Sequence, residues 1–255
     1  QLSVIGLGFR MSLTEAVEVG KSGLLMTIGA ISGTLLLGYI IGRLFKIEKK
    51  ISHLISSGTA ICGGSAIAAI SPVIRANKKE ISIALGTIFV LNSLALIIFP
   101  MIGKGLSLSQ TQFGVWAAIA IHDTSSVIGA ASAYGDKALE IATTMKLGRA
   151  LWIIPIVVVE SLVFKNNISK SAFPFFILLF IGAMVLNTLT TSYEPLFASI
   201  FLWSKKGLVL TLFLIGSSLS AQSLKQGGIR PFFQGALLWI IVSSFSLGLI
   251  YAFMK

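Results

Sequence analysis

Two ionisable side chains, His122 and Asp123, stand side by side inside the otherwise apolar run 118–133. A charged group costs about 2.5–3.5 kcal/mol at the centre of an inserted membrane helix, so one found there usually faces a polar cavity. Three hydroxyl residues follow directly, namely Thr124, Ser125 and Ser126. We expect Asp123 to cap a helix that begins at Thr124, and His122 to face a cavity where it exchanges a proton near neutral pH. The alternative is a structural cap beside a histidine that is bonded to a backbone carbonyl.

A second candidate segment, 56–71, is rich in glycine and small polar residues. Its candidate binding residues are Gly58, Thr59, Cys62, Gly63, Gly64 and Ser65. Such a sequence resists a continuous lipid-facing helix, and where it unwinds it frees amide groups and a positive helix N-terminus for an anion. Close packing of small residues between helices explains the same composition without a ligand.

A third candidate pair, Lys146 and Arg149, precedes the apolar run 150–159. The spacing of three places the two side chains on neighbouring parts of one helical face, where they could jointly hold a doubly charged oxyanion. Alternatively, both side chains extend to the polar edge of the membrane. Asn92, inside another apolar block, is a weaker candidate, because asparagine there usually bonds between helices.

The composition is that of a membrane protein. Of 255 residues, 55% are hydrophobic and only 11% are charged, and the mean hydropathy is +0.92; soluble domains carry about 25% charged residues. The net charge of +11 comes from basic residues between apolar blocks, which argues against nucleic-acid binding and for loops beside an anionic leaflet. One cysteine and two histidines predict neither a disulfide nor a metal site, and no cofactor or enzymatic motif is recognisable.

Eight apolar blocks have about the length that a bilayer requires, and some are short enough to be broken or re-entrant. They cover residues 23–42, 51–70, 81–102, 112–133, 147–164, 173–189, 207–220 and 231–253. Residues 2–11 resemble the end of a ninth segment, so we expect further membrane helices to precede this chain. The short loops predict a single membrane domain over residues 1–255.

The loop charges do not assign a sidedness. Strict alternation of spans places the basic loop 43–50 on one side and the basic loop 71–80 on the other, which nearly cancels the bias that orients membrane proteins. The bias is restored if segment 51–70 enters the membrane and turns back. The sequence leaves both arrangements open.

A weak internal repeat relates the two ends of the chain. Residues 8–20 and 216–228 share glycines and a serine at a constant offset of about 208, and each copy precedes a long apolar helix. Duplicated halves, often inverted in the membrane, are typical of secondary transporters.

Four blocks together resemble the YeiH-like family of bacterial inner-membrane proteins, which is assigned to sulfate export. They read GFRMSLTEAVEVG, SGTAICGGSAIAAISPVI, AIHDTSSVIGAA and TMKLGRALWIIPIV, and they extend over essentially the whole chain. Within them the resemblance marks Gly58, Ala60, Cys62, Gly63, His122, Lys146 and Arg149. It implies a fold similar to bile-acid and sodium/proton transporters, with inverted repeats and two broken helices that cross.

We therefore predict an all-α, multi-pass inner-membrane transporter for a small inorganic anion, with sulfate or a related sulfur oxyanion as the substrate that the resemblance implies. The segments around Gly63 and Asp123 should meet near the bilayer midplane, with His122 coupling transport to protons. An antiporter that exchanges sodium or protons on Asp123, a channel and a non-translocating sensor are the alternatives. The sequence does not decide whether the protein forms homo-oligomers.

Overall fold

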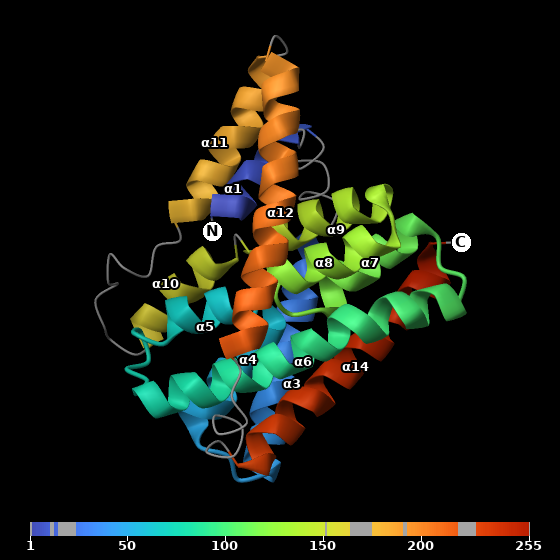
Figure 1. Cartoon of the computed structure of the whole chain (residues 1–255). Helices are drawn as coiled ribbons and strands as arrows, with labels where there is room; N and C mark the ends of the chain where they lie inside the picture. Colours follow the sequence, from blue (N-terminus) through green and yellow to red (C-terminus); the bar gives the residue numbers. More distant parts are fainter. Residues whose placement is uncertain are drawn as a thin grey trace.

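A computed structural model describes residues 2–10, 13–14, 24–150, 152–163, 175–190, 193–218 and 228–254. The regular elements within these ranges are all helical (Figure 1). They are α1 (Leu2–Leu7), η1 (Gly8–Arg10), α3 (Leu24–Leu44), α4 (Lys49–Ala60), α5 (Gly64–Ile70), α6 (Lys78–Gly105), α7 (Gln110–Ala120), α8 (Thr124–Tyr134), α9 (Asp136–Ala150), α10 (Ile153–Val163), α11 (Phe175–Leu189), α12 (Glu194–Ser218) and α14 (Ile229–Phe253). The predicted all-helical class is confirmed for the described residues.

Four helical stretches in the described part of the chain are long and apolar enough to cross a membrane. They cover Thr27–Leu44, Lys78–Gly105, Asp136–Leu162 and Ile229–Phe253. This is fewer than the eight or nine segments expected from the apolar blocks. Two of those blocks, 51–70 and 112–133, each fold into a pair of short helices joined by a tight turn, because glycine or a helix-capping residue interrupts the helix at mid-block.

The first pair, α4 and α5, is a hairpin and not one helix that crosses with a break. The amide of Gly63 donates to the carbonyl of Gly58 at 2.8 Å, which closes the turn. A Cβ atom added to Gly58 would lie 3.1 Å from the side chain of Ile67, so α5 folds back against α4.

Both open ends of this first hairpin lie on one side of the molecule. Lys50 Nζ, at the start of α4, donates to the carbonyl of Arg75, beyond the end of α5, at 2.8 Å. The carboxyl of Glu48 lies against that of Glu80 at the start of α6, and this hydrogen bond together with burial raises the pKa of Glu48. A continuous helix would separate residues 50 and 75 by roughly 37 Å, at 1.5 Å per residue. The re-entrant arrangement left open by the sequence is therefore the one adopted.

The second pair, α7 and α8, forms a hairpin of the same kind. The hydroxyl of Tyr134, the last residue of α8, donates to the carbonyl of Leu108, just before α7, at 2.6 Å. The rings of Tyr134 and Phe113 stack with their centroids 3.8 Å apart. The amide of Lys137 donates to the side chain of Gln110 at 3.0 Å, so here too the chain returns to the side from which it entered.

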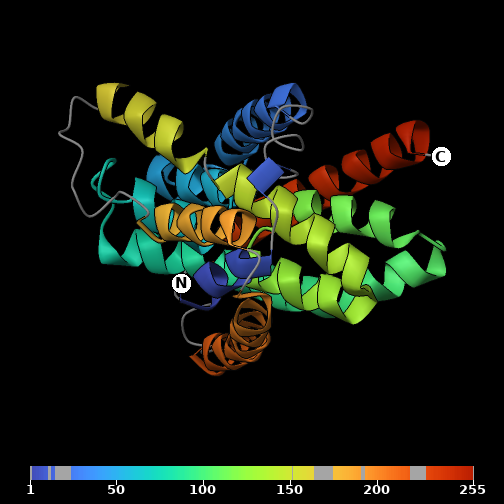
Figure 2. The ribbon, with the colours of Figure 1, turned by 90° about the horizontal axis from the view of Figure 1, so that it is seen from above.

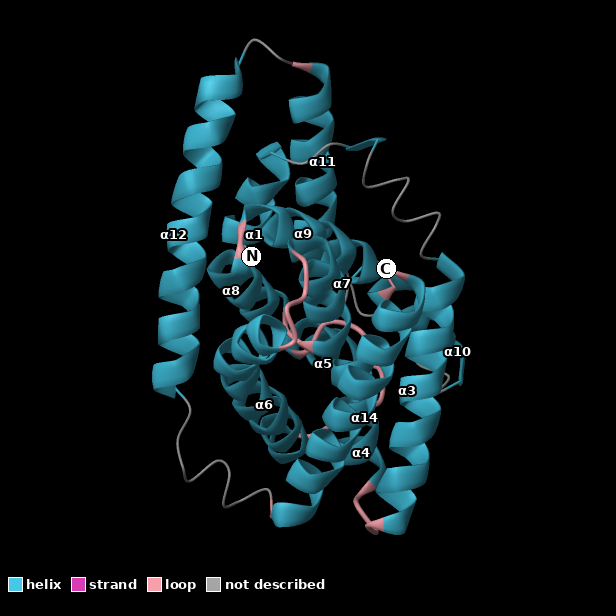
Figure 3. Cartoon of the chain, turned by 90° about the vertical axis from the view of Figure 1, so that its right-hand side faces the viewer, coloured by secondary structure: helices cyan, strands magenta, loops and turns pink. Residues whose placement is uncertain are grey.

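Helix α6 connects the open end of one hairpin to the open end of the other. It begins with a capping box formed by Asn77 and Glu80, and its 28 residues span about 42 Å. The two hairpins therefore enter from opposite ends of α6, and their turns lie near its middle, where Asn92 contacts residues 122 and 123. Figure 3 shows the loop segments of these turns inside the helix assembly, between α5 and α8.

The remaining helices enclose the two hairpins. Helices α3 and α14 pack against α4 through Gln234, whose side-chain amide donates to the carbonyl of Gly38 at 2.9 Å and to the hydroxyl of Ser52 at 2.7 Å. Figure 2 shows α12 on the other side of the hairpins from α3. Most positions of the predicted internal repeat, among them Ser12 and Ser220, lie outside the described residues.

The re-entrant first hairpin predicts a specific labelling pattern. In a C62A background, cysteines introduced at the exposed positions Lys46 and Lys79 should react with an impermeant maleimide from the same face of membrane vesicles. A cysteine at Lys104, at the far end of α6, should react only from the opposite face. Labelling of positions 46 and 79 from opposite faces would show that segment 51–70 crosses the membrane.

Candidate functional site

The turns of the two hairpins contact each other directly. Gly63 has a φ of +63°, and a Cβ atom added to it would lie 3.1 Å from the Cα of Asp123. Both facts require glycine, because a side chain would strain the backbone and collide with the opposite turn. We call residues 61–63 and 121–123 the two tips, and their contact the junction. The expected meeting of the segments around Gly63 and Asp123 is therefore present.

Asn92 on α6 holds the second tip in place. Its Oδ1 accepts hydrogen bonds from the amides of His122, at 3.1 Å, and Asp123, at 3.3 Å. The side chain is 2% exposed. The sequence predicts that Asn92 forms a hydrogen bond between helices. The structure shows that its side chain bonds to the second tip, which is part of the candidate site.

Asp123 caps α8, as its position before Thr124 predicts. Its Oδ2 accepts from the amides of Ser125, at 3.0 Å, and Ser126, at 3.3 Å. The positive end of α8 therefore already faces a carboxylate. The amides of Ser125 and Ser126 are therefore bonded within the turn, and the role of Ser125 in substrate binding stays a prediction.

Lys146 and Arg149 bond to the carbonyl ends of the hairpin helices. Lys146 Nζ donates to the carbonyls of Ile121, at 2.7 Å, and Ala118, at 3.3 Å. Arg149 Nε donates to the carbonyl of Ala60 at 2.8 Å, and one terminal nitrogen donates to that of Ile119 at 3.3 Å. These four carbonyls belong to the C-terminal ends of α4 and α7, which have no partner within their own helices.

This arrangement excludes one of the two interpretations of the lysine–arginine pair. Lys146 is 0% and Arg149 6% exposed, so neither side chain reaches the membrane edge. Their charges lie against the negative ends of two helix dipoles, where a cation is most stable. Both side chains bond to backbone carbonyls, and the second terminal nitrogen of Arg149 bonds to none of the described residues. The joint binding of an oxyanion by the pair stays a prediction.

Several buried polar atoms near the junction have no hydrogen-bond partner among the described residues. They are both ring nitrogens of His122, Nδ2 of Asn92, the second terminal nitrogen of Arg149 and the hydroxyls of Ser57 and Thr59. Ser57 and Thr59 lie in the last turn of α4, which leads into the first tip. A buried donor without a partner costs about 1–3 kcal/mol. The set therefore indicates a place where a polar solute completes the hydrogen bonding.

The predicted alternative for His122, a bond from its ring to a backbone carbonyl, is not found in the described part of the chain. The residue is 0% exposed, and neither ring nitrogen bonds to any residue that the structure describes. Its backbone amide donates to Asn92.

The other predicted site residues divide between the junction and helix packing. A Cβ atom on Gly58 would contact Ile67 and Ile88, and one on Gly64 would contact the ring of Phe89, so both glycines serve the close approach of α4, α5 and α6. Cys62 is a buried free thiol in the first tip that faces the amide of Ala66 and the hydroxyl of Ser65. Thr124 and Ser126 begin α8, beside the second tip.

A cavity of about 550 Å³ reaches Arg149 and the last turn of α7 from one side. It lies between α3, α7, α9 and α14, and Arg149 is the only charged residue among those that line it. Thr34 and Ser246 contribute hydroxyls to an otherwise mainly apolar wall. The cavity extends from the surrounding helices to the guanidinium group of Arg149, which bonds to both hairpins.

The charges at the junction do not balance. Counted as formal charges, Asp123 provides one negative charge and Lys146 and Arg149 provide two positive charges, with His122 taken as neutral. No group of three or more potential metal ligands occurs among the described residues. The junction therefore combines an excess of positive charge with a surplus of donors, which suits an anion.

The sequence gives Asn92 only weak support as a site residue, and it includes Ser57 in the candidate segment 56–71 without selecting it as a binding residue. Asparagine has an ordinary role in membrane helices, and nothing local marks Asn92 as a neighbour of the tips. Asn92 lies at the middle of α6, and the two hairpins enter from the opposite ends of this helix. This position identifies Asn92 as a site residue.

Removal of the lysine amine should destabilise the protein. Lys146→Met leaves the carbonyls of Ala118 and Ile121 buried without this donor, at a cost of about 1–3 kcal/mol. We expect the melting temperature in detergent to fall by several degrees. Lys137→Met is the matched control, because the side chain of Lys137 is 61% exposed and its pairing with Glu140 contributes little. Equal melting temperatures for both variants would contradict the proposed role of Lys146.

Comparison with known proteins identifies the relatives of this chain. A family model described as conserved hypothetical protein 698 matches residues 1–235. A UPF0324 membrane protein of Bacteroides thetaiotaomicron is 54% identical over 253 residues, which cover 98% of this chain and 77% of the relative. UPF0324 membrane proteins of Porphyromonas gingivalis and Geobacter sulfurreducens are 53% and 51% identical, with coverage of 98% and 97% of this chain and 77% and 79% of the relatives.

No solved structure matches the chain. The relatives are named as membrane proteins, in agreement with the apolar helices described above. The match over most of the chain supports the family resemblance found in the sequence blocks. The chain belongs to the family described as conserved hypothetical protein 698, the UPF0324 membrane proteins.

Proposed function

We propose that this protein is a secondary transporter that carries a small inorganic oxyanion across a bacterial inner membrane. The observation that carries the proposal is a set of buried donors near the junction that bond to none of the described residues, on Asn92, His122, Arg149, Ser57 and Thr59. An oxyanion accepts several hydrogen bonds at once, so it replaces its hydration shell with such groups. The resemblance to the YeiH-like family makes sulfate or a related sulfur oxyanion the proposed substrate.

The electrostatics support an anion over a cation as the transported ion. Helix C-termini near the midplane are places where transporters hold sodium or protons. Here Lys146 and Arg149 occupy those ends. Asp123, the carboxylate that an antiporter would use, accepts two amide hydrogen bonds from its own helix. A sodium ion would meet two fixed positive charges and a carboxylate that is already bonded.

The hairpin arrangement supports an orientation of the protein in the membrane. Because α4 and α5 return to one side, the basic loops 43–50 and 71–80 lie on the same side. Seven basic residues stand there, namely Arg43, Lys46, Lys49, Lys50, Arg75, Lys78 and Lys79. The loop 103–110 at the other end of α6 has a single lysine. The bias of basic residues toward the cytoplasm places the open end of the first hairpin on the cytoplasmic side.

The two tips suggest how access alternates. Each hairpin reaches the junction from its own side of the membrane, so movement of one tip exposes the anion to that side while the other tip keeps it covered. Rocking of one helix group against another around a midplane site is the general mechanism of secondary transporters.

Asn92→Asp tests the proposed substrate site. Aspartate keeps Oδ1 for the amides of His122 and Asp123, but it replaces the Nδ2 donor with negative charge, which repels an oxyanion. We expect uptake of labelled sulfate into proteoliposomes to fall at least tenfold. Asn77→Asp makes the same chemical change at the N-cap of α6, where aspartate and asparagine cap equally well, and should keep uptake. Unchanged uptake in the Asn92 variant would remove this residue from the site.

His122→Ala tests proton coupling. If the buried imidazole takes up and releases the coupled proton, sulfate flux should depend on an imposed pH gradient in the wild type and lose that dependence in the variant.

The same liposomes separate the other function classes. Movement of labelled sodium without sulfate would favour a cation antiporter, a current that does not saturate would favour a channel, and binding without counterflow would favour a sensor.

A further inference from the structure

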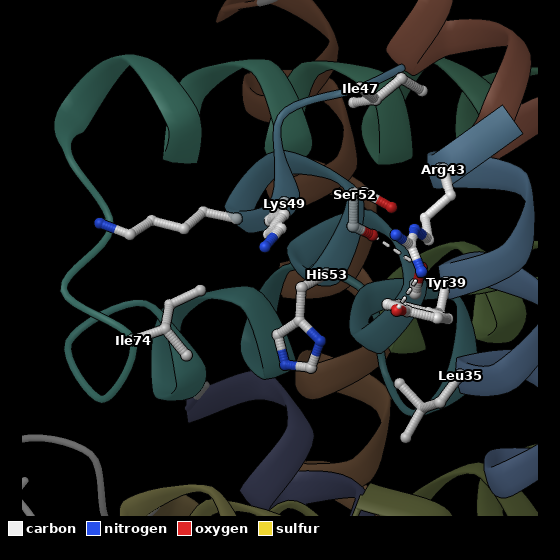
Figure 4. A pocket seen from close by; sticks show the side chains of 11 residues that line it. Leu35, Tyr39, Arg43, Ile47, Lys49, Ser52, His53 and Ile74 are labelled. Carbon is white, nitrogen blue, oxygen red and sulfur yellow. Dashed lines mark hydrogen bonds between the residues drawn. The ribbon is translucent and has the colours of Figure 1, made fainter. Parts of the chain in front are cut away.

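A second cavity, of about 260 Å³, lies at the open end of the first hairpin (Figure 4). It is formed between the last turns of α3, the first turns of α4 and the segment after α5. Figure 4 shows Arg43, Lys49 and His53 around this pocket, near the end of α3 and the start of α4 and away from the tip of the hairpin. None of these residues belongs to the site described above.

The polar part of this pocket is basic. Its lining includes Arg43, Lys49 and Lys50 and no carboxylate. Arg43 donates one hydrogen bond, to the hydroxyl of Tyr39 at 3.1 Å, and Lys49 donates to none of the residues that the structure describes. Two carboxylates lie nearby: Glu160 pairs with His53 of the pocket wall at 2.7 Å, and Glu48 bonds to Glu80. Among the described residues, neither forms an ion pair with Arg43 or Lys49. The charge of Arg43 and Lys49 is therefore available to an anion.

The other part of the pocket is apolar. Leu35, Ile47 and Ile74 line it. On the same end of α3, Tyr39 is 56% and Leu44 73% exposed. Exposed apolar side chains beside tyrosine and arginine are typical of a helix end at the level of the lipid headgroups. A ligand that fits this pocket carries negative charge at one end and hydrocarbon at the other.

We propose that this pocket binds the phosphate group of an anionic phospholipid of the cytoplasmic leaflet. Arg43 and Lys49 contact the phosphate, and Leu35, Ile47 and Ile74 contact the glycerol and the upper acyl chain. Basic pockets between membrane helices on the cytoplasmic side bind lipid headgroups in this way. A lipid held here joins α3 to the first hairpin, next to the bond between Lys50 and the carbonyl of Arg75.

The test measures binding of phosphatidylglycerol to delipidated protein by native mass spectrometry, with phosphatidylcholine as the neutral lipid. The variant R43Q/K49Q should bind phosphatidylglycerol about 30-fold more weakly, since each basic residue near the surface contributes about a factor of five. The control K78Q/K79Q removes two exposed basic residues from the same side of the molecule but outside the pocket, and should retain wild-type affinity. The single variant K49Q, expected to lose about fivefold, keeps the test valid if the double variant is unstable.

Three results would overturn the proposal. Equal losses in the pocket variant and the control would show that the lipid responds to surface charge alone. Equal binding of phosphatidylcholine would show that charge is not recognised. Competition by inorganic phosphate or sulfate at millimolar concentration would show that the pocket takes a free oxyanion. The measurement involves no transport, so its failure leaves the proposed function untouched, and a failed flux assay leaves the lipid pocket untouched.

Discussion

The ends of short helices inside a membrane protein are the constraint on which this structure depends. Two hairpins place four helix ends near the middle of α6, where lipid offers no hydrogen bonds to the free amides and carbonyls. Lys146 and Arg149 bond to the carbonyl ends of α4 and α7, and Asp123 bonds to the amide end of α8. Each partner has the charge that the adjacent helix dipole favours, so the junction is held by side chains of the protein itself.

The same partners set the chemical character of the junction. Once two cations and one carboxylate have satisfied the helix ends, a net positive charge remains, together with donors on Asn92, Arg149 and His122 that have no partner among the described residues. The residues that stabilise the fold and those proposed to bind an anion therefore lie side by side. The close contact between Gly63 and Asp123 joins the two hairpins, so a solute bound at the junction is in a position to sense the movement of either tip.

Local features of the site could be predicted from the sequence where the physics is local. The cap formed by Asp123 depends on the residues directly after it, and the interruption at Gly63 depends on a glycine that adopts a positive φ. The roles of Lys146 and Asn92 could not be predicted, because their partners lie 25 to 31 residues away in the chain. Spacing placed Lys146 and Arg149 on one face of a helix, but it did not reveal which carbonyls lie opposite that face.

Composition and hydropathy alone determined that this is an all-helical membrane protein with polar interruptions in two apolar blocks, because the transfer of side chains into lipid depends on each segment separately. Only the tertiary structure decided that both interrupted blocks turn back. A block of about 20 apolar residues can span the bilayer or fold into a hairpin, and contacts with α6 and with the opposite tip favour the hairpin. The tertiary structure also decided that the buried cations satisfy helix ends, since this depends on which distant carbonyls the fold brings within hydrogen-bonding distance.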